Sequence, residues 1–226
     1  MLVNERRALV LAGGMLAGAV LACVLVAIPT TFAWVQTIDD WTYDLAGNLQ
    51  SRPLTLIAEG FSLIGSTLVN WPLRIAALAL LAWRRHWLSL TAFALAVITS
   101  ELLIGVLKSA YDRPRPPDSL IETSAASFPS GHAIAGAVTA VGLVLVLLPA
   151  GRKRWQWELY AVWFALFMAL SRVYLHAHWL SDVVAGALLG AGLALGWPAL
   201  LLRLRAWRQA RFRSHPVTTD QDAARD

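Results

Sequence analysis

The chain has 226 residues, of which 58% are hydrophobic and only 15% are charged, and its mean hydropathy is +0.57. Soluble globular domains usually carry about 25% charged residues, so this composition excludes an ordinary soluble domain and favours an integral membrane protein. The net charge of +5 does not indicate nucleic-acid binding, because most basic residues lie in short clusters between long apolar runs. The single cysteine, Cys23, excludes an intrachain disulfide.

Six apolar runs are candidates for transmembrane helices, since a hydrocarbon core about 30 Å thick needs roughly 20 apolar residues per helix. In chain order they cover residues 8–28, 54–83, 87–107, 133–148, 159–175 and 183–202. The first run exceeds the usual core of a cleaved signal peptide, so we expect a retained anchor. The second run is broken around Asn70-Trp71-Pro72, because proline disrupts a helix interior. It therefore predicts a short helix over 54–64, followed by a span that ends at Trp83.

Basic clusters alternate with the apolar runs and predict the topology. They gather at one side of the predicted bundle, at Arg6/Arg7, Arg84/Arg85, Arg152/Lys153/Arg154 and Arg203/Arg205/Arg208/Arg211/Arg213. The positive-inside rule makes this side cytoplasmic. Residues 1–212 are thus predicted to form one all-α, six-helix transmembrane bundle with both termini in the cytoplasm. The polar segment 213–226 is expected to be a disordered cytoplasmic tail.

The opposite, outer face is predicted to carry fewer basic residues, and Glu101 is predicted to lie inside the third span, where an acid usually faces the bundle interior. The basic residues assigned to the outer face are Arg52, Arg74, Lys108, Arg113, Arg115 and Arg172. The first outer loop has an apolar stripe at helical spacing: Trp34, Ile38, Trp41, Leu45 and Leu49. Three acids, Asp39, Asp40 and Asp44, lie off that stripe, so the loop is interpreted as an amphipathic interfacial helix. The alternative is an ordinary loop with tryptophans at the membrane interface.

Three clusters on the outer face carry candidate chemistry, beginning with Lys108 and Arg115 in a proline-rich, extended stretch over 108–116. The second cluster, 129–132, is Pro129-Ser130-Gly131-His132, where Ser130 is a predicted N-cap. A helix that begins there directs N–H groups at the outer face and favours an anion. Gly131 allows close approach of a ligand to the backbone, and His132 can donate a proton.

The third cluster, 171–182, contains Arg172, His178 and Asp182. His178 and Asp182 are four residues apart and would share a face of a helix, so the carboxylate can fix the imidazole tautomer. The other ring nitrogen can then act as nucleophile or base. Each cluster alone has a simpler explanation: an interfacial cation, a capped helix or an ion pair. Together, three cations and backbone amides suit a phosphoryl group, whose charge is spread over three oxygens.

Lys108-x6-Arg115-Pro116, Pro129-Ser130-Gly131-His132 and Ser171-Arg172-x5-His178-x3-Asp182 resemble the three signature blocks of the type 2 phosphatidic acid phosphatase superfamily. The resemblance covers order, spacing and six-span layout, over residues from about 55 to 200. It implies that His178 attacks phosphorus, that Asp182 orients it, and that His132 protonates the leaving oxygen and then activates water. It further implies that Lys108, Arg115, Ser130, Gly131 and Arg172 bind the phosphoryl oxygens, with no metal or cofactor. Tyr111, Asp112, Arg113, Ser171 and His176 are adjacent, without an assigned role.

The resemblance and the spans together imply a lipid phosphate substrate, in a bacterial cell membrane with the site facing the periplasm or exterior. Isoprenyl diphosphates, phosphatidylglycerophosphate, phosphatidic acid and lipid A phosphates stay open as substrates, as does transfer of the phosphoryl group to another lipid. Three other functions are alternatives: an intramembrane serine protease using Ser130 and His178, a lipid-phosphate binder or transporter, and a metal site. The metal site would use His132, His176, His178 and Asp182, but the nearby cations would repel a dication.

Overall fold

The computed structural model describes residues 5–123, 125–149, 151 and 153–213, and the only regular secondary structure within these residues is helix. The predicted all-α class is therefore confirmed. The predicted tail 213–226 lies, from residue 214 onward, outside the described residues. The helices are α1 (Glu5–Ala27), α2 (Pro29–Asn48), α3 (Arg52–Gly65), α4 (Thr67–Trp83), α5 (Trp87–Tyr111), α6 (Gly131–Leu147), α7 (Arg154–Tyr174) and α8 (Leu180–Arg213).

Several of these helices have the length and hydropathy of membrane spans. Helices α1, α5 and α8 each meet that criterion, and α3 and α4 meet it together as a broken span bent by 46°. Helix α6 is apolar but has only 17 residues. The structure thus supports an integral membrane protein, while the count of six spans and the cytoplasmic termini stay predictions.

The break in the second apolar run lies at Ser66, between α3 and α4, and not at the predicted Asn70-Trp71-Pro72. Pro72 is the sixth residue of α4, where only one backbone N–H is lost and the helix continues. Gly65, the last residue of α3, lies against α7 and α6: a Cβ there would be 2.3 Å from Met168 Sδ and 3.0 Å from His132 Cδ2. Close packing, rather than proline, therefore marks the break.

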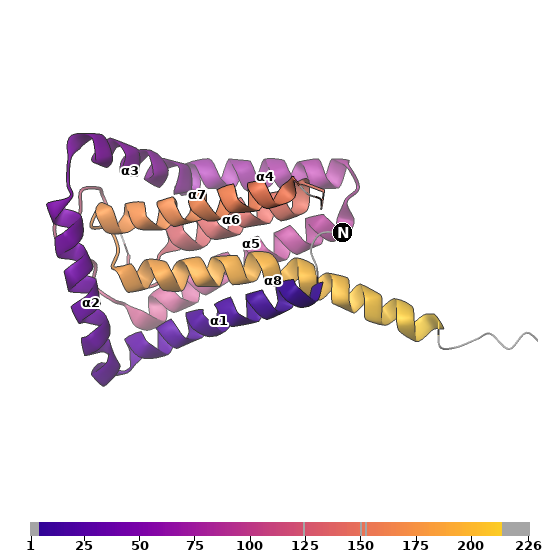
Figure 1. Ribbon diagram of the computed structural model, residues 1–226, viewed down its shortest axis with the longest axis horizontal. Helices are drawn as coiled ribbons and strands as arrows, with labels where there is room; N and C mark the ends of the chain where they lie inside the picture. The colour runs from indigo at the N-terminus through magenta and orange to yellow at the C-terminus, as the bar shows by residue number, and fades with distance from the viewer. Residues whose placement is uncertain (1–4, 124, 150, 152, 214–226) are drawn as a thin grey trace, which may run out of the picture.

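Helix α2 lies across one end of the bundle and connects α1 to α3 (Figure 1). The N-terminus and the long C-terminal part of α8 lie at the other end. The predicted helix in the first loop is confirmed, and its apolar stripe is exposed, with Trp34 77% and Trp41 64% accessible. Asp39, by contrast, is only 1% exposed. Helix α2 therefore turns tryptophans outward and an acid toward the bundle.

Helix α6 is the centre of the bundle and packs against α5, α7 and α8. Its contact with α8 depends on two glycines one helical turn apart, Gly186 and Gly190. A Cβ at Gly186 would lie 2.7 Å from the Ser130 carbonyl oxygen, and one at Gly190 would lie 2.5 Å from the Ile134 carbonyl oxygen. Small residues at this spacing let helix backbones approach closely in membranes. They fix α8 beside the first turn of α6.

Arg74 was predicted to lie on the outer face, and this is wrong: it is 1% exposed inside the bundle, where α4, α5 and α6 meet. Its guanidinium donates to Glu101 Oε1 at 2.6 Å and to Thr139 Oγ1 at 2.8 Å. Glu101 thus does face the bundle, as predicted. The sequence shows two isolated charges, and only the packing of α4 on α5 and α6 reveals that they form a pair.

We expect Gly190→Ala and Gly186→Ala to destabilise the protein by about 1–3 kcal/mol each, the usual cost of overpacking. The matched control is Gly105→Ala on α5, where a Cβ would meet nothing within 4 Å. Alanine has the higher helix propensity, so this control should be neutral or slightly stabilising. The measurement is the thermal unfolding midpoint in detergent. Equal midpoints for Gly190→Ala and Gly105→Ala would show that the α6–α8 contact is not tight.

Candidate functional site

The three sequence clusters meet at the end of the bundle that α2 covers. Lys108 lies in the last turn of α5, the second cluster begins α6, and the third connects α7 to α8. The loop after α5 runs back over this end, since Ser127 N–H donates to the Arg113 carbonyl at 2.8 Å and Leu120 N–H donates to the Leu175 carbonyl at 3.0 Å. The fold therefore brings together residues separated by about 70 positions in sequence.

His178 and Asp182 are in contact, but not as two residues on one helix. Helix α8 begins at Leu180, so His178 lies in the turn before it. Its Nδ1 lies 3.4 Å from Asp182 Oδ2, while its Nε2 points away toward Arg115. The predicted pairing is present because Asp182, in the first turn of α8, also accepts the Trp179 N–H at 2.9 Å and so folds the preceding turn over the helix start.

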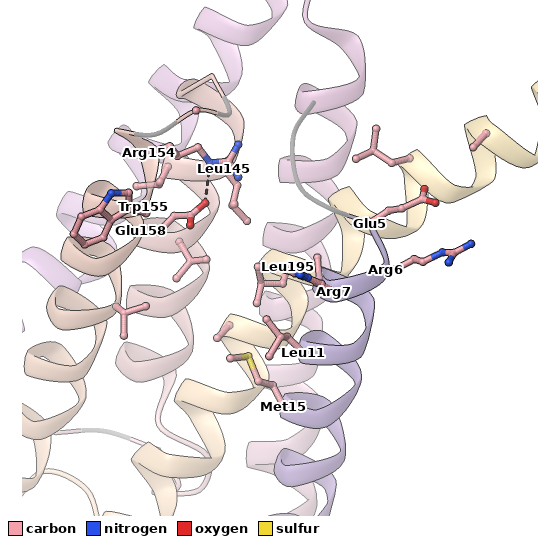
Figure 2. A pocket seen from close by; sticks show the side chains of 18 of the residues that line it. Glu5, Arg6, Arg7, Leu11, Met15, Leu145, Arg154, Trp155, Glu158 and Leu195 are labelled. Carbon is pink, nitrogen blue, oxygen red and sulfur yellow. Dashed lines mark hydrogen bonds and ion pairs between the residues drawn. The ribbon is translucent and has the colours of Figure 1, made fainter.

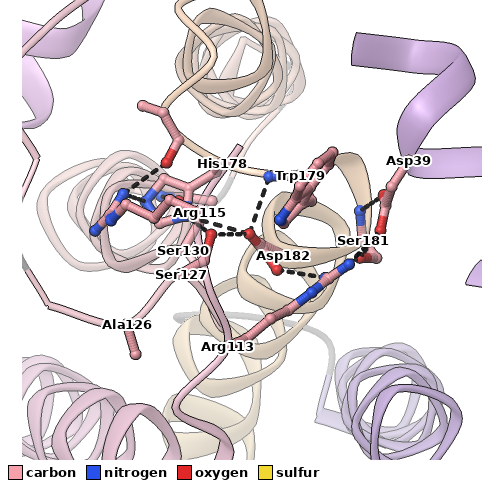
Figure 3. A network of polar contacts seen from close by, with 12 residues as sticks. Asp39, Arg113, Arg115, Ala126, Ser127, Ser130, His178, Trp179, Ser181 and Asp182 are labelled. Atoms are coloured by element: carbon pink, nitrogen blue, oxygen red, sulfur yellow. Dashed lines mark hydrogen bonds and ion pairs between the residues drawn. The ribbon is translucent and has the colours of Figure 1, made fainter. Parts of the chain in front are cut away.

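The Asp182 carboxylate is fully buried and is held from several sides (Figure 3). Oδ1 accepts from Arg113 at 2.8 Å, and Oδ2 accepts from the Ser127 hydroxyl and the Trp179 N–H. A buried carboxylate is stable only when it is paired and hydrogen-bonded. These contacts fix it on the Nδ1 side of His178, which leaves Nε2 as the reactive nitrogen.

His178 itself is 2% exposed. Burial lowers the pKa of its imidazole to about 4, Asp182 opposes that shift, and the positive charges of Arg115 and Arg172 add to it. The ring is therefore neutral at ordinary pH. A neutral imidazole with a fixed tautomer is the form that can attack an electrophile.

One predicted cation, Arg115, lies beside the imidazole on the Nε2 side, and Lys108 lies near Arg115. Arg115 donates from Nη1 to the Ala177 carbonyl at 2.6 Å and lies 3.1 Å from His178 Nε2. Lys108 donates to the Ala126 carbonyl and lies close enough to Arg115 and Arg172 for their charges to interact. Three like charges held this close in a half-buried site are unfavourable unless an anion joins them.

Arg172 and His132 are both held by Ser62 of α3. The Arg172 guanidinium donates to the Ser62 hydroxyl, and the His132 ring is hydrogen-bonded to the Ser62 backbone. Arg172 is 3% exposed, and its Nε is buried without a hydrogen-bond partner among the described residues. An unpaired buried donor beside two other cations fits an oxyanion ligand.

The start of α6 is capped as predicted, since Ser130 Oγ accepts the Ala133 N–H at 3.4 Å. The Ser130 N–H donates to the Asp182 carbonyl oxygen at 3.0 Å, so that donor already has a partner. The next amides, of Gly131 and His132, have no acceptor within a helix because they lie in its first turn. A Cβ at Gly131 would meet nothing closer than Ile104 at 3.8 Å, so protein packing does not require glycine at this position.

Four residues that contribute to the site were not predicted from the sequence: Arg113, Asp39, Ser127 and Ser62. Arg113 donates to Asp182 and, at 2.7 Å, to Asp39 of α2, which in turn accepts the Ser181 N–H at 2.8 Å. Both carboxylates and the guanidinium are nearly inaccessible. The only sequence signals were a second arginine in the 108–116 block and an acid off the stripe of α2, and neither signal identifies the residue with which it pairs.

Two other sequence interpretations are not supported by the geometry. His176 packs on Tyr43 of α2, with ring centroids 4.0 Å apart, and within the described part of the chain no three His, Cys, Asp or Glu side chains converge as metal ligands. The Ser127 hydroxyl lies 3.4 Å from His178 Nδ1, while the Ser130 hydroxyl caps α6. The serine that a protease would need is therefore not the one beside the histidine.

Comparison with known proteins identifies the family. Residues 89–206 match the PAP2 superfamily model. An undecaprenyl-diphosphatase from Sulfolobus acidocaldarius is 32% identical over 53% of this chain, which spans only 58% of that relative's length. Phosphatidylglycerophosphatase B from Bacillus subtilis is 31% identical over 69% of this chain and 79% of that protein. The crystal structure of a transmembrane PAP2-type phosphatidylglycerolphosphate phosphatase from Bacillus subtilis superposes with a TM-score of 0.69 at 25% identity, covering 88% of this chain and 96% of that one.

The arrangement predicts that Arg113 sets the charge beside His178. Arg113→Gln should raise the pKa of His178 above its value of about 4, because Asp182 then loses its positive partner and stabilises the imidazolium more strongly. Arg113→Lys keeps the charge and should change the pKa much less. The measurement is an NMR titration of ¹⁵N-histidine in detergent, with His178→Ala to assign the resonance.

Removing one partner of a buried ion pair costs about 3–5 kcal/mol, so the thermal midpoint of Arg113→Gln is measured first. If that variant does not fold, Asp39→Asn provides the opposite change: Arg113 is then shared with one carboxylate fewer, and the pKa of His178 should fall or stay low. A His178 pKa near 6.5 in the unmodified protein would contradict this description of the site.

Proposed function

Because this chain belongs to the PAP2 superfamily, we propose that it is a membrane lipid phosphatase that uses His178 as nucleophile and needs no metal ion. The single observation that carries the proposal is the position of the His178 ring. A buried carboxylate lies 3.4 Å from Nδ1 and a guanidinium lies 3.1 Å from Nε2. The first group fixes the tautomer, and the second places an anion-binding group at the reactive nitrogen.

In the proposed first step, Nε2 of His178 attacks phosphorus, an N–P bond forms, and the P–O bond to the lipid breaks. His132 donates a proton to the departing oxygen, and Asp182 stabilises the imidazolium character of His178. Lys108, Arg115 and Arg172, with the amides at the start of α6, bind the equatorial oxygens, where charge must be stabilised in a loose transition state. In this structure Arg115 contacts Nε2 directly, so a phosphoryl group would take over that contact.

In the second step, His132 accepts a proton from water, the water oxygen attacks phosphorus, and the N–P bond breaks to release inorganic phosphate. The same histidine therefore serves as acid and then as base, which requires it to be within reach of the leaving oxygen and the incoming water. Its contact with Ser62 of α3 holds the ring at the edge of the site. Helix α3 thus takes part in orienting the second histidine.

We further propose that the substrate is a lipid phosphate that enters from the bilayer at the end covered by α2, on the outer membrane face. Support comes from the exposed apolar stripe of α2 beside the site and from the named activities of the relatives, which act on isoprenyl and glycerolipid phosphates. In this proposal the site residues bind only the phosphoryl group. They therefore serve an isoprenyl diphosphate, phosphatidylglycerophosphate, phosphatidic acid or a lipid A phosphate equally well.

Purified protein is expected to release phosphate from at least one of these four lipid classes, and His178→Ala should reduce the rate at least about 10³-fold because no other group can form the covalent intermediate. The reaction is run with and without EDTA, and the chelator should not change the rate. An acid-labile phosphoprotein should be trapped with His132→Ala and a substrate with a good leaving group. With such a substrate the first step needs no acid, while the second step still needs a base. Phosphate release that survives His178→Ala would falsify the nucleophile assignment.

Asp39 is expected to affect turnover although it lies on α2 and not at the reacting atoms. Asp39→Asn should lower kcat roughly 10-fold with little change in KM, since it weakens the support of Arg113 and Ser181 behind Asp182 without touching the phosphate-binding cations. Asp44→Asn is the matched control, because Asp44 lies on the same helix and is exposed. A rise in KM with unchanged kcat, or an equal effect of Asp44→Asn, would mean that α2 acts on lipid entry and not on the pair of His178 and Asp182.

A further inference from the structure

A second lipid-sized site lies at the end of the bundle opposite the histidines. It is a groove of about 1140 Å³ between α1, α6, α7 and α8. Helix α1 packs along α8, whereas α7 packs on α6, α3 and α8, so the groove separates the first turns of α1 from those of α7. None of the groups proposed for phosphate release lines it.

The groove is basic at its mouth and apolar along its depth. Its charged lining residues are four arginines and two glutamates: Arg6, Arg7, Arg154, Arg205, Glu5 and Glu158. Deeper residues are apolar and include Leu11, Met15, Leu145, Val162 and Leu195. Figure 2 shows Arg154 and Glu158 on one wall and Arg7, Leu11 and Met15 on the facing wall, while Arg6 points away. This order of charge and apolarity is that of a phospholipid, with its headgroup at the mouth.

The length of the groove matches one leaflet of a bilayer. From Glu5 to Met15 the lining of α1 spans ten residues, or about 15 Å at 1.5 Å per residue. Half of a hydrocarbon core about 30 Å thick is the same length. An acyl chain can therefore lie along the groove with its headgroup among the arginines.

Arg154 gives an independent indication of an anionic ligand. It is 6% exposed, and its Nε donates to Glu158 at 2.8 Å. Its Nη1 atom is buried and has no hydrogen-bond partner within the described residues. A buried guanidinium donor without an acceptor is costly, and a phosphodiester oxygen would satisfy it.

We propose that this groove binds one anionic phospholipid from the leaflet opposite the phosphatase site, through Arg154, Arg205 and Arg7. A phosphodiester lipid such as phosphatidylglycerol is the ligand class, because it supplies one negative charge at the mouth and two acyl chains. Such a lipid carries no terminal phosphate, so it is not a substrate for the proposed phosphatase. The inference is therefore independent of the proposed function, and its failure would leave that proposal intact.

The test uses the full-length protein in detergent with two probes of identical acyl chains, dioleoyl-phosphatidylglycerol and dioleoyl-phosphatidylcholine. Native mass spectrometry should show one phosphatidylglycerol retained per chain, several-fold more strongly than phosphatidylcholine. Arg205→Gln should weaken retention about fivefold, the usual effect of one basic residue at an anionic lipid surface. Arg154→Gln should weaken it further.

The matched control is Arg203→Gln, which removes the same charge two residues away on α8 but does not line the groove. It should retain phosphatidylglycerol as the unmodified protein does. Because Arg154 is buried and its variant can lose stability, Arg7→Gln and Arg205→Gln, both at exposed residues, decide the outcome. Equal retention of the two lipids, or equal weakening by Arg203→Gln, overturns the proposal: the groove would then hold any lipid, or the basic end would act only through its overall charge.

Discussion

The buried carboxylate of Asp182 is the group on which the rest of this end of the molecule depends. It is inaccessible to solvent, so it requires a full set of donors, and these donors come from two separate segments of the chain. Arg113 and Ser127 come from the loop after α5, Trp179 from the turn before α8, and His178 lies beside it. Satisfying one charge therefore joins the loop and the α7–α8 turn into a single arrangement around the imidazole, and the backbone carbonyl of Asp182 adds the start of α6 by accepting the Ser130 N–H.

Arg113 extends that arrangement to α2. One guanidinium carries a single positive charge between two buried carboxylates, so removing Arg113 would leave both carboxylates without their cation in a dry environment. Asp39 completes this set and also accepts from Ser181, so a helix that turns its tryptophans outward is tied to the start of α8. Asp39, which supports the groups behind His178, and the exposed apolar stripe are thus parts of one helix.

Local patterns in the sequence predicted what depends on local structure. Long apolar runs predicted the membrane helices, and the helical spacing of apolar residues predicted α2. The Ser130 cap was predicted from its residue type at a helix start. The resemblance of three sequence blocks to the signature blocks of the superfamily indicated the candidate catalytic and phosphate-binding residues. The features that the sequence did not predict depend on contacts between distant segments. They are the pairing of Arg74 with Glu101, the contact of Asp39 with Arg113, and the position of the break at Ser66, beside which Gly65 packs on Met168. A single sequence carries no record of which distant residue a buried charge will meet.

The two ends of the bundle use arginine in different ways, and the difference follows from what surrounds each guanidinium. Near the histidines, Arg115 and Arg172 lie beside another cation and amide donors, and such surroundings favour a compact, multiply charged anion. At the opposite end, the arginines lie at the mouth of a long apolar groove, so a ligand that fills the groove needs both a negative headgroup and an acyl chain. The first surroundings suit a phosphoryl group and do not distinguish the lipid attached to it. The second suit a whole lipid molecule and contain no group that could cleave it.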